Sequence, residues 1–341
     1  MKPTSVVLPV LLLGLTLSCS SSQKDSRFDK QIELKFNSLG VEDLFYKPLC
    51  IEIFDSLLLI CDPTPESVYK ILNINTKQII CEGVNIGEGP YELLSPTLID
   101  RIDNHRFQVM DIAKIVCYDI NEIIKTGNFL PYSIISYDVV GKTKDLTRRF
   151  YEIDDSSYIA LGIFKEAKYM LSSKGEMKLG GNYPTSEEKN VHPFLVHQGV
   201  MHVDRERKLL LYHSPFGYYY ELLSYANEKI TTLCYDYSPH SYKIINGECL
   251  ITAQTPCGIN DAEILNEGIL LLYSGTTMEE SPKMHFYCKK IWNLDLQGKY
   301  QTEYLLERPT AMMAVNEQNS TIYAITVHPD TYELELGFYR Y

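Results

Sequence analysis

A glycine-rich segment, Gly87–Glu92 (GEGPYE), carries residue types that could hold a ligand. Glycine turns bind phosphates in nucleotide-binding proteins, but such a loop needs a following Lys-Ser/Thr pair or a following helix. The pair is absent, and Pro90 comes directly after the second glycine. We therefore interpret the segment as a tight turn that needs glycine's backbone freedom. Glu88, Tyr91 and Glu92 remain candidate ligand contacts beside that turn.

Two aspartates, Asp62 and Asp111, end equivalent apolar segments. Carboxylates placed this way could line a channel and hold Ca²⁺, which binds several oxygens. Aspartates that end strands also accept hydrogen bonds from backbone amides of the turn that follows. We favour the second interpretation, so no cofactor is assigned, and Ca²⁺ remains the alternative.

Four of the eight histidines, His192, His197, His202 and His213, lie within one stretch of about 20 residues. They form no H-E-x-x-H metal motif, and the chain has no G-x-S-x-G nucleophile motif. His197 precedes an expected inner strand and is a candidate for facing a channel. A catalytic histidine needs an oriented partner, which the sequence does not reveal. No catalytic residue and no metal ligand are therefore assigned.

The amino terminus has the pattern of an export signal. A short basic start is followed by an apolar run over residues 6–17 and then by Cys19. This pattern resembles a bacterial lipoprotein signal, although Thr16 stands where leucine is usual, and an ordinary secretory peptide is the alternative. The resemblance implies removal of residues 1–18 and lipidation of Cys19, which would anchor an exported chain to the bacterial envelope, with the outer membrane expected. The polar residues 19–30 are predicted to form a flexible tether.

The other eight cysteines make an even number, which in an exported protein suggests disulfides. Their spacing gives no C-x-x-C pair and no zinc pattern. Several, such as Cys61 and Cys81, lie inside apolar runs, where cysteine behaves as a small buried hydrophobe. A bond between Cys249 and Cys257 is the remaining alternative.

Composition narrows the possible partners. The 341 residues include 32 basic and 44 acidic side chains, for a net charge of -12. An acidic surface repels phosphate backbones, so we expect no nucleic-acid partner. Hydrophobic residues at 45% and charged residues at 22% are typical of a globular chain.

Short apolar segments bounded by Asp, Asn, Gly, Ser or Pro recur along the chain and predict an all-β fold. One apolar strand repeats six times at intervals of 49 to 61 residues. Its copies are centred on Leu59, Val109, Leu161, Leu210, Leu271 and Ala324. This period predicts a β-propeller with six four-stranded antiparallel blades, forming one domain over residues 31–341. Insertions are expected at 240–257 and 276–287.

Closure of the ring needs a strand from the amino terminus. The last blade has three strand-like segments, and an open sheet edge invites aggregation. The strand-like residues 31–36 precede the first blade, whose inner strand is expected at 49–54. We predict that residues 31–36 become the outer strand of the last blade.

The lipoprotein signal, the six repeats and the G-x-G-P-x-E stretch after the first blade resemble the TolB-like six-bladed propeller lipoproteins of Bacteroidetes. The resemblance implies a propeller at the cell envelope and assigns no activity. The connection from one blade to the next normally lies on the face where propellers bind ligands, which would place Glu88, Tyr91 and Glu92 near the channel mouth.

The leading functional hypothesis is a monomeric, non-enzymatic binding module for an envelope protein, a peptide or a glycan. An enzyme that uses the channel, such as a metal-dependent hydrolase, a lactonase or a lyase, is the alternative. A scaffold within an envelope complex is a third possibility. Fold alone does not choose among them.

Overall fold

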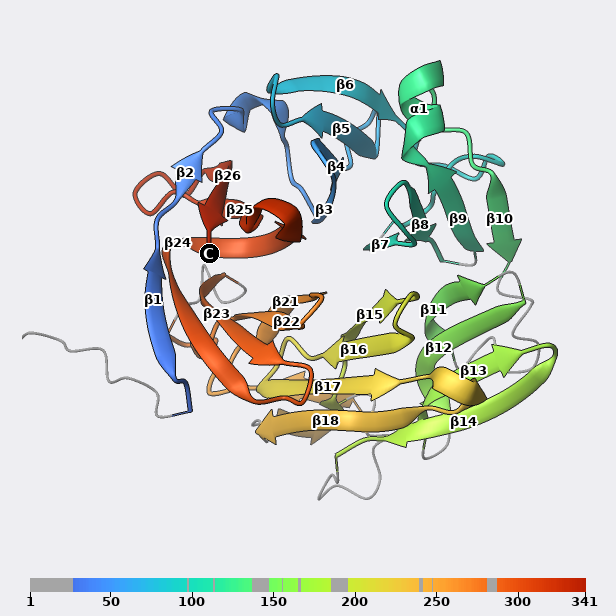
Figure 1. Ribbon diagram of the computed structural model, residues 1–341, viewed down its shortest axis with the longest axis vertical. Coiled ribbons are helices and arrows are strands. Elements are labelled where there is room, and N and C mark those ends of the chain that lie inside the picture. Colours follow the sequence, from blue (N-terminus) through green and yellow to red (C-terminus); the bar gives the residue numbers. More distant parts are fainter. Residues whose placement is uncertain are drawn as a thin grey trace, which may run out of the picture.

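The computed structural model describes residues 27–96, 98–112, 114–136, 147–154, 156–164, 167–184, 196–238, 242–246, 248–280 and 287–341. In this part of the chain, antiparallel sheets form six blades arranged in a ring (Figure 1). The fold is therefore the predicted all-β propeller. No helix within the described ranges is long and apolar enough to cross a membrane.

The first four blades are separate four-stranded sheets. Blade 1 contains β3 (Cys50–Phe54), β4 (Leu57–Cys61), β5 (Tyr69–Asn73) and β6 (Gln78–Gly83). Blade 2 contains β7 (Leu98–Arg101), β8 (Arg106–Met110), β9 (Lys114–Asp119) and β10 (Ser133–Ser136). Blade 3 contains β11 (Thr147–Asp154), β12 (Ser157–Phe164), β13 (Ala167–Ser173) and β14 (Glu176–Asn182). Blade 4 contains β15 (Val200–Asp204), β16 (Leu209–His213), β17 (Tyr218–Ser224) and β18 (Thr231–Ser238).

Blades 5 and 6 share one long strand. Blade 5 contains β21 (Ile259–Ile264), β22 (Gly268–Tyr273), β23 (Cys288–Asp295) and the first half of β24 (Tyr300–Asn316). The second half of β24 is the inner strand of blade 6 and pairs with β25 (Thr321–Val327), which pairs with β26 (Leu334–Arg340). Pro309 lies between the two halves, where the register shifts. Because proline donates no backbone hydrogen bond, it suits this change of partners.

The chain closes its ring with residues from the amino terminus. β2 (Asn37–Ser38) pairs antiparallel with β26 and is the outer strand of blade 6. Closure by an amino-terminal strand in the last blade is therefore confirmed. The residue range differs from the prediction of 31–36, because β1 (Lys30–Leu34) instead runs parallel to the first half of β24, on the outer edge of blade 5. Gly337 permits the close approach of β2, since a Cβ there would lie 2.4 Å from the Asn37 carbonyl oxygen.

Residues 27–30 also belong to the propeller, which corrects the predicted extent of the tether. Phe28 is 4% exposed and packs against Trp292. The Arg27 guanidinium lies 4.8 Å from the Trp292 ring centre and 4.9 Å from that of Tyr300. These cation–π and apolar contacts fix the start of the described chain to blade 5. Cys19 and the rest of the predicted signal and tether lie outside the described residues.

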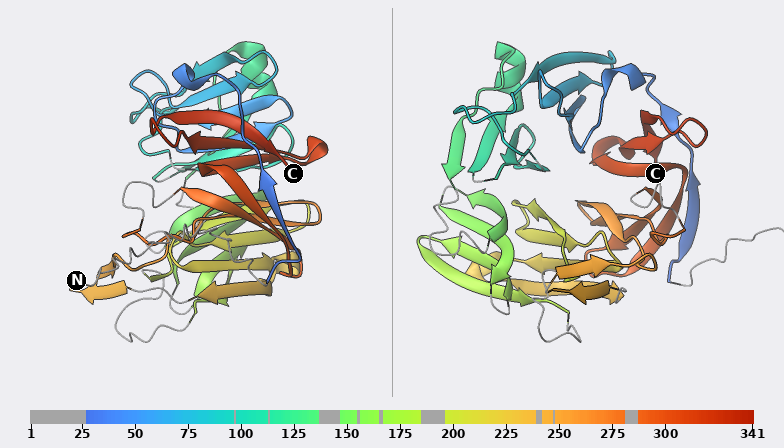
Figure 2. Two further views of the ribbon diagram at one scale, coloured as in Figure 1. Left: turned by 90° about the vertical axis from the view of Figure 1, so that its left-hand side faces the viewer. Right: turned by 180° about the vertical axis from the view of Figure 1, so that it is seen from behind.

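The six repeated segments are the second strands of the six blades, as predicted. Their central residues are fully buried: Leu59, Val109, Leu161, Leu210, Leu271 and Ala324. A strand covered on both faces by neighbouring blades is apolar along its whole length. The side view of the ring shows neighbouring blades lying against one another (Figure 2, left).

Two short elements are additions to the four-stranded blades. A short helix, α1 (Ile120–Thr126), follows β9, because the Asp119 side chain caps it and Gly127 ends it in a left-handed conformation. The hairpin of β19 (Tyr242–Ile245) and β20 (Glu248–Ile251) lies inside the predicted insertion 240–257. The eight described cysteines are free thiols, so the alternative Cys249–Cys257 bond is not formed.

Candidate functional site

The predicted turn at Gly87–Glu92 is held by its own glutamate. The Glu92 carboxylate accepts a hydrogen bond of 2.8 Å from the Gly89 amide. It also lies over Gly87, where an added Cβ would be 2.1 Å from a Glu92 carboxylate oxygen. Glu92 is therefore a structural part of the turn. Glu88 and Tyr91 are exposed on the same turn, and Tyr91 is 54% exposed.

Asp62 fixes the segment through which the chain enters blade 1. Its buried carboxylate accepts hydrogen bonds from the backbone amides of Tyr46 and Lys47. The Lys70 ammonium lies 2.8 Å from the same carboxylate and also donates to the Leu44 carbonyl. These bonds reach residues 15 and 16 positions earlier, not the turn that follows.

Asp111 repeats this arrangement in blade 2. Its carboxylate accepts hydrogen bonds from the amides of Leu94 and Ser95, and Lys114 donates to the Glu92 carbonyl. With backbone amides occupying their oxygens, the two aspartates do not fit the interpretation as channel-lining Ca²⁺ ligands. In the described ranges, no group of three or more His, Cys, Asp or Glu side chains is placed to hold a metal ion.

His197 lies away from the inner strands, which corrects its predicted orientation toward the channel. It is 4% exposed, and its ring lies 5.9 Å from Tyr219 of β17 and 6.0 Å from Tyr237 of β18. It also stacks on Tyr183. His197 is therefore part of an aromatic cluster over the third and fourth strands of blade 4.

Ionisable side chains that the sequence analysis did not select gather where the inner strands end. We call this end of the ring the hairpin face, since it carries the turns between the first and second strands at 55–56, 102–105, 205–208, 265–267 and 317–320. Two adjoining cavities of about 220 and 290 Å³ open here and share several lining residues. Their charged lining residues are Glu52, Asp55, Asp100, Arg101, Asp103, Asp204, Arg205, Glu206, Arg207, Glu263 and Glu317. We call this region the central site.

Arg205 has all its hydrogen-bonding capacity directed at protein groups. It lies 2.5 Å from Asp100 and donates to the carbonyls of Glu152 and Arg101. Gln108 donates to the same Asp100 oxygen at 2.6 Å. This network holds the ends of β7, β11 and β15 together.

The other two arginines of the central site are also paired. Arg207 donates to Asp204 at 2.7 Å and to the carbonyls of Leu265 and Asn266. The Arg101 guanidinium lies 3.8 Å from a Glu52 carboxylate oxygen. Each arginine charge therefore has a carboxylate partner within the site.

Acidic groups remain after this pairing. Burial, with the nearby Glu52 carboxylate, raises the pKa of Glu263 well above its usual range. Burial raises the pKa of Asp261, two residues earlier on β21, to about 7, although the Met313 amide donates to it. Glu206 is exposed at the rim. Crowded carboxylates of this kind favour a cationic ligand, which would restore their ionisation.

A histidine pair lies beside the same cavity. The Nε2 atoms of His202 and His213 are 3.0 Å apart, and His213 Nδ1 lies 2.9 Å from the Ile259 carbonyl oxygen. Because a carbonyl only accepts, His213 carries its proton on Nδ1, and His202 must donate through Nε2. Burial lowers the pKa of His202 to about 4 and that of His213 to about 3, so both rings are neutral at pH 7. His202 then presents an unprotonated Nδ1.

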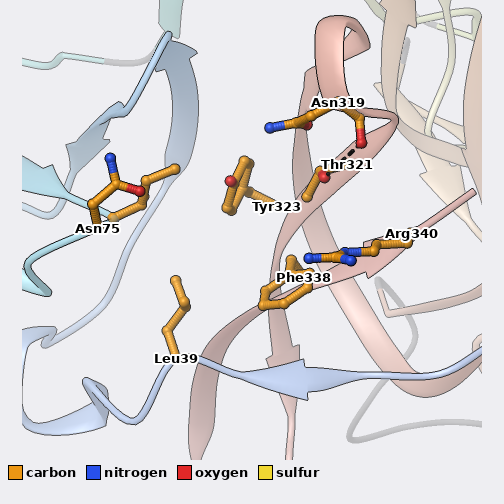
Figure 3. A pocket seen from close by; sticks show the side chains of 8 residues that line it. Leu39, Asn75, Asn319, Thr321, Tyr323, Phe338 and Arg340 are labelled. Atoms are coloured by element: carbon orange, nitrogen blue, oxygen red, sulfur yellow. Dashed lines mark hydrogen bonds between the residues drawn. The ribbon is translucent and has the colours of Figure 1, made fainter.

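A separate groove of about 410 Å³ lies where the ring closes. Figure 3 shows that it is bounded by Leu39, by Asn75 of blade 1 and by side chains of blade 6. Arg340 lies over the Phe338 ring at 5.6 Å. The groove combines aromatic, amide and cationic side chains, a mixture typical of small-ligand sites.

The sequence did contain a signal for the central site. Asp100-Arg101 and Asp204–Arg207 (DRER) place charged residues at the ends of inner strands, where neighbouring blades bring them together. Their convergence depends on the ring, because the two segments are about 100 residues apart in the chain.

Comparisons with known proteins agree with the fold. A family model described as TolB-like 6-blade propeller-like matches residues 26–318. A solved structure of a member of the DUF4221 family from Bacteroides vulgatus is 12% identical, with a TM-score of 0.50, over 91% of this chain and 98% of that one.

Two further solved structures are more distant. BamB from Moraxella catarrhalis is 8% identical, with a TM-score of 0.37, over 85% of this chain and 71% of that one. The extracellular domain of a putative hybrid two-component system from B. thetaiotaomicron is 10% identical, with a TM-score of 0.45, over 86% of this chain and 34% of that one. A search of curated proteins found no match. Because the family model spans most of the propeller, this chain belongs to the TolB-like six-blade propeller family.

Proposed function

We propose that this protein is a non-enzymatic binding module of the bacterial envelope and that its central site holds a basic segment of a partner protein or peptide. The observation that carries the proposal is the charge balance of the central site. Arg101, Arg205 and Arg207 are each paired with a carboxylate. Glu206 and Glu263 form no salt bridge among the described residues, and Glu263 shares the charge of Arg101 with Glu52. The remaining charge is negative and calls for a cation.

The shape of the site supports a side chain or short segment as the ligand. The two cavities adjoin, and the larger, of about 290 Å³, is lined by residues of five blades. A lysine or arginine side chain fits such a volume, and its charge would lower the pKa of Glu263 toward its usual range. Residues on either side of that side chain would contact the turns of the hairpin face.

The proposed location follows from the amino terminus. Lipidation at Cys19 would attach the chain to the envelope, with the outer membrane expected. The remaining tether of residues 19–26 is short, so the propeller would stay near the membrane. A net charge of -12 disfavours an anionic partner.

A labelled pentalysine peptide is the direct probe, with binding followed by fluorescence anisotropy at low and high salt. The double variant Glu206→Gln/Glu263→Gln removes both carboxylates, and we expect its affinity to fall roughly five- to twentyfold. The matched control is Glu82→Gln/Glu176→Gln, which changes exposed glutamates on outer strands and should bind as the parent does.

The rival surface is tested with the same probe. Glu88 and Tyr91 lie on the connection into blade 2, at the opposite ends of the inner strands from the hairpin face. If Tyr91→Ala or Glu88→Gln weakens pentalysine binding and the central double variant does not, the binding face is the one predicted from sequence. Equal losses for the central and control variants would show non-specific attraction and overturn the proposal.

A further inference from the structure

Two free cysteines face each other inside blade 1. Cys50 opens the inner strand β3, and Cys61 closes its neighbour β4. The register pairs these two residues directly, and the Leu49 amide donates to the Cys61 carbonyl at 2.7 Å. Figure 1 shows β3 and β4 as adjacent strands toward the inside of the ring.

The Cα spacing expected for this pair is compatible with a disulfide. Phe54 and Leu57 flank a two-residue turn and form a hydrogen-bonded pair, so every second pair along the hairpin, ending at Cys50 and Cys61, is of the same kind. Cα atoms in such pairs lie about 5.5 Å apart, inside the range of 4.4–6.8 Å found for disulfides. The Cβ atoms of opposite residues start about 4.5–5.5 Å apart, so bond formation draws the two strands slightly together, and the resulting strain makes the bond more easily reduced.

The two side chains differ in their access to solvent. The neighbouring Cys61 thiol and burial raise the pKa of Cys50 well above its usual range. Cys61 is fully buried, whereas Cys50 is partly exposed. An external disulfide can therefore reach Cys50 first, and Cys61 lies within reach of Cys50.

We propose that Cys50 and Cys61 form a reversible cross-strand disulfide by exchange with a disulfide-bearing oxidant such as a thiol oxidase of the envelope or oxidised glutathione. The Cys50 thiolate attacks the oxidant, forming a mixed disulfide and releasing one thiolate. The Cys61 thiolate then attacks the Cys50 sulfur, forming the internal bond and releasing the second. The two cysteine protons pass to the two released thiolates, so two electrons leave the protein and reduce the oxidant.

The bond would act on the wall of the central site. Glu52, two residues after Cys50, lines that site and pairs with Arg101. A cross-link at the start of β3 would fix this strand, which carries Glu52, against β4. This restraint would be the same with and without a bound ligand. The inference is thus independent of the proposed binding function, and exchange with glutathione in solution is independent of the cell envelope.

The test uses the purified full-length chain in glutathione buffers of graded redox ratio at pH 8.5, because thiol–disulfide exchange proceeds through thiolates and is faster at alkaline pH. Samples are quenched with acid, unfolded, alkylated and digested with trypsin. Both cysteines fall on the single tryptic peptide 36–70, because trypsin does not cut Lys47-Pro48. We expect this peptide to appear two hydrogens lighter and unalkylated in oxidising buffer, and doubly alkylated after reduction.

Matched variants complete the test. Cys81→Ser changes a buried cysteine of β6 in the same blade and should leave the cross-link intact. Cys50→Ser should abolish it and leave Cys61 alkylated. A doubly alkylated peptide 36–70 from the parent chain across the whole redox series would overturn the proposal, as would persistent glutathione adducts on Cys50 without the internal bond.

Discussion

The Lys70 ammonium lies 2.8 Å from the Asp62 carboxylate, and both side chains are almost completely withdrawn from solvent. The pair joins the second and third strands of blade 1 to the segment that enters the blade, through the amides of Tyr46 and Lys47. Blade 2 uses Asp111 for the same purpose. In blades 1 and 2, the aspartate after the second strand thus fastens the entering segment to its own blade.

We expect Asp62→Ala to lower the free energy of unfolding by about 3–5 kcal/mol, because it leaves a buried ammonium without its counter-ion. Two backbone amides also lose their acceptor. Urea unfolding followed by circular dichroism measures the change. Asp43→Ala, at an exposed position, is the control and should shift stability by less than about 0.5 kcal/mol. Similar effects for the two variants would contradict the role assigned to Asp62.

The turn at Gly87–Glu92 predicts a compensating pair of substitutions. Gly87→Ala alone should destabilise the chain by about 1–3 kcal/mol, because its Cβ would overlap the Glu92 carboxylate. In a Glu92→Ala background that overlap is absent, so the added cost of Gly87→Ala should largely disappear. A double-mutant cycle measured by thermal unfolding gives the coupling. Additive effects would show that the carboxylate does not lie over Gly87.

The amino-terminal arm, residues 27–39, should be required for a closed ring. A chain that starts at residue 27 should melt at the temperature of the parent, because the contacts of Phe28, β1 and β2 are retained. A chain that starts at residue 40 exposes the edges of β24 and β26, and we expect a lower Tm and aggregation. Calorimetry with light scattering distinguishes the two truncations. If both melt together, the arm does not contribute to closure.

Asp261 should make stability depend on pH. Its folded pKa is about 7 and that of an unfolded aspartate is about 4, so the folded chain binds more protons between these values. The stability from this group is complete below pH 4 and is lost as the pH rises toward 7.

Asp261→Asn cannot ionise and keeps an acceptor for the Met313 amide. We therefore expect the Tm of this variant, relative to the parent, to increase between pH 5 and pH 8. The control Asp43→Asn should follow the parent at every pH. A Tm difference that is constant across the range would show that Asp261 titrates normally.

The strands of this protein could be predicted from the sequence because strands that are buried on both faces carry apolar residues in unbroken runs. Second strands such as Leu57–Cys61 and Leu209–His213 are apolar at nearly every position, and their spacing counts the blades. The helix after β9 is not predicted by its sequence pattern, because seven residues are too few for a helical period, although Asp119 and Gly127 are typical caps.

The candidate site also has parts that the sequence predicts and parts that it does not. Gly87 and Glu92 could be recognised as a turn from local chemistry, since their contacts are five residues apart. His197 could not be placed, because its orientation depends on Tyr219 and Tyr237, which lie in later strands of its blade.

The sequence alone determined the all-β class, the six blades and the need for an amino-terminal strand in the last blade, because these follow from periodic burial and from counting strands. Only the tertiary structure decided that β2 closes the ring while β1 joins blade 5, and that Arg101 and Arg205 meet carboxylates from other segments in the central site. Ring closure brings these residues together from distant parts of the chain. Contacts over such chain distances produce no periodic pattern in the sequence from which they could be predicted.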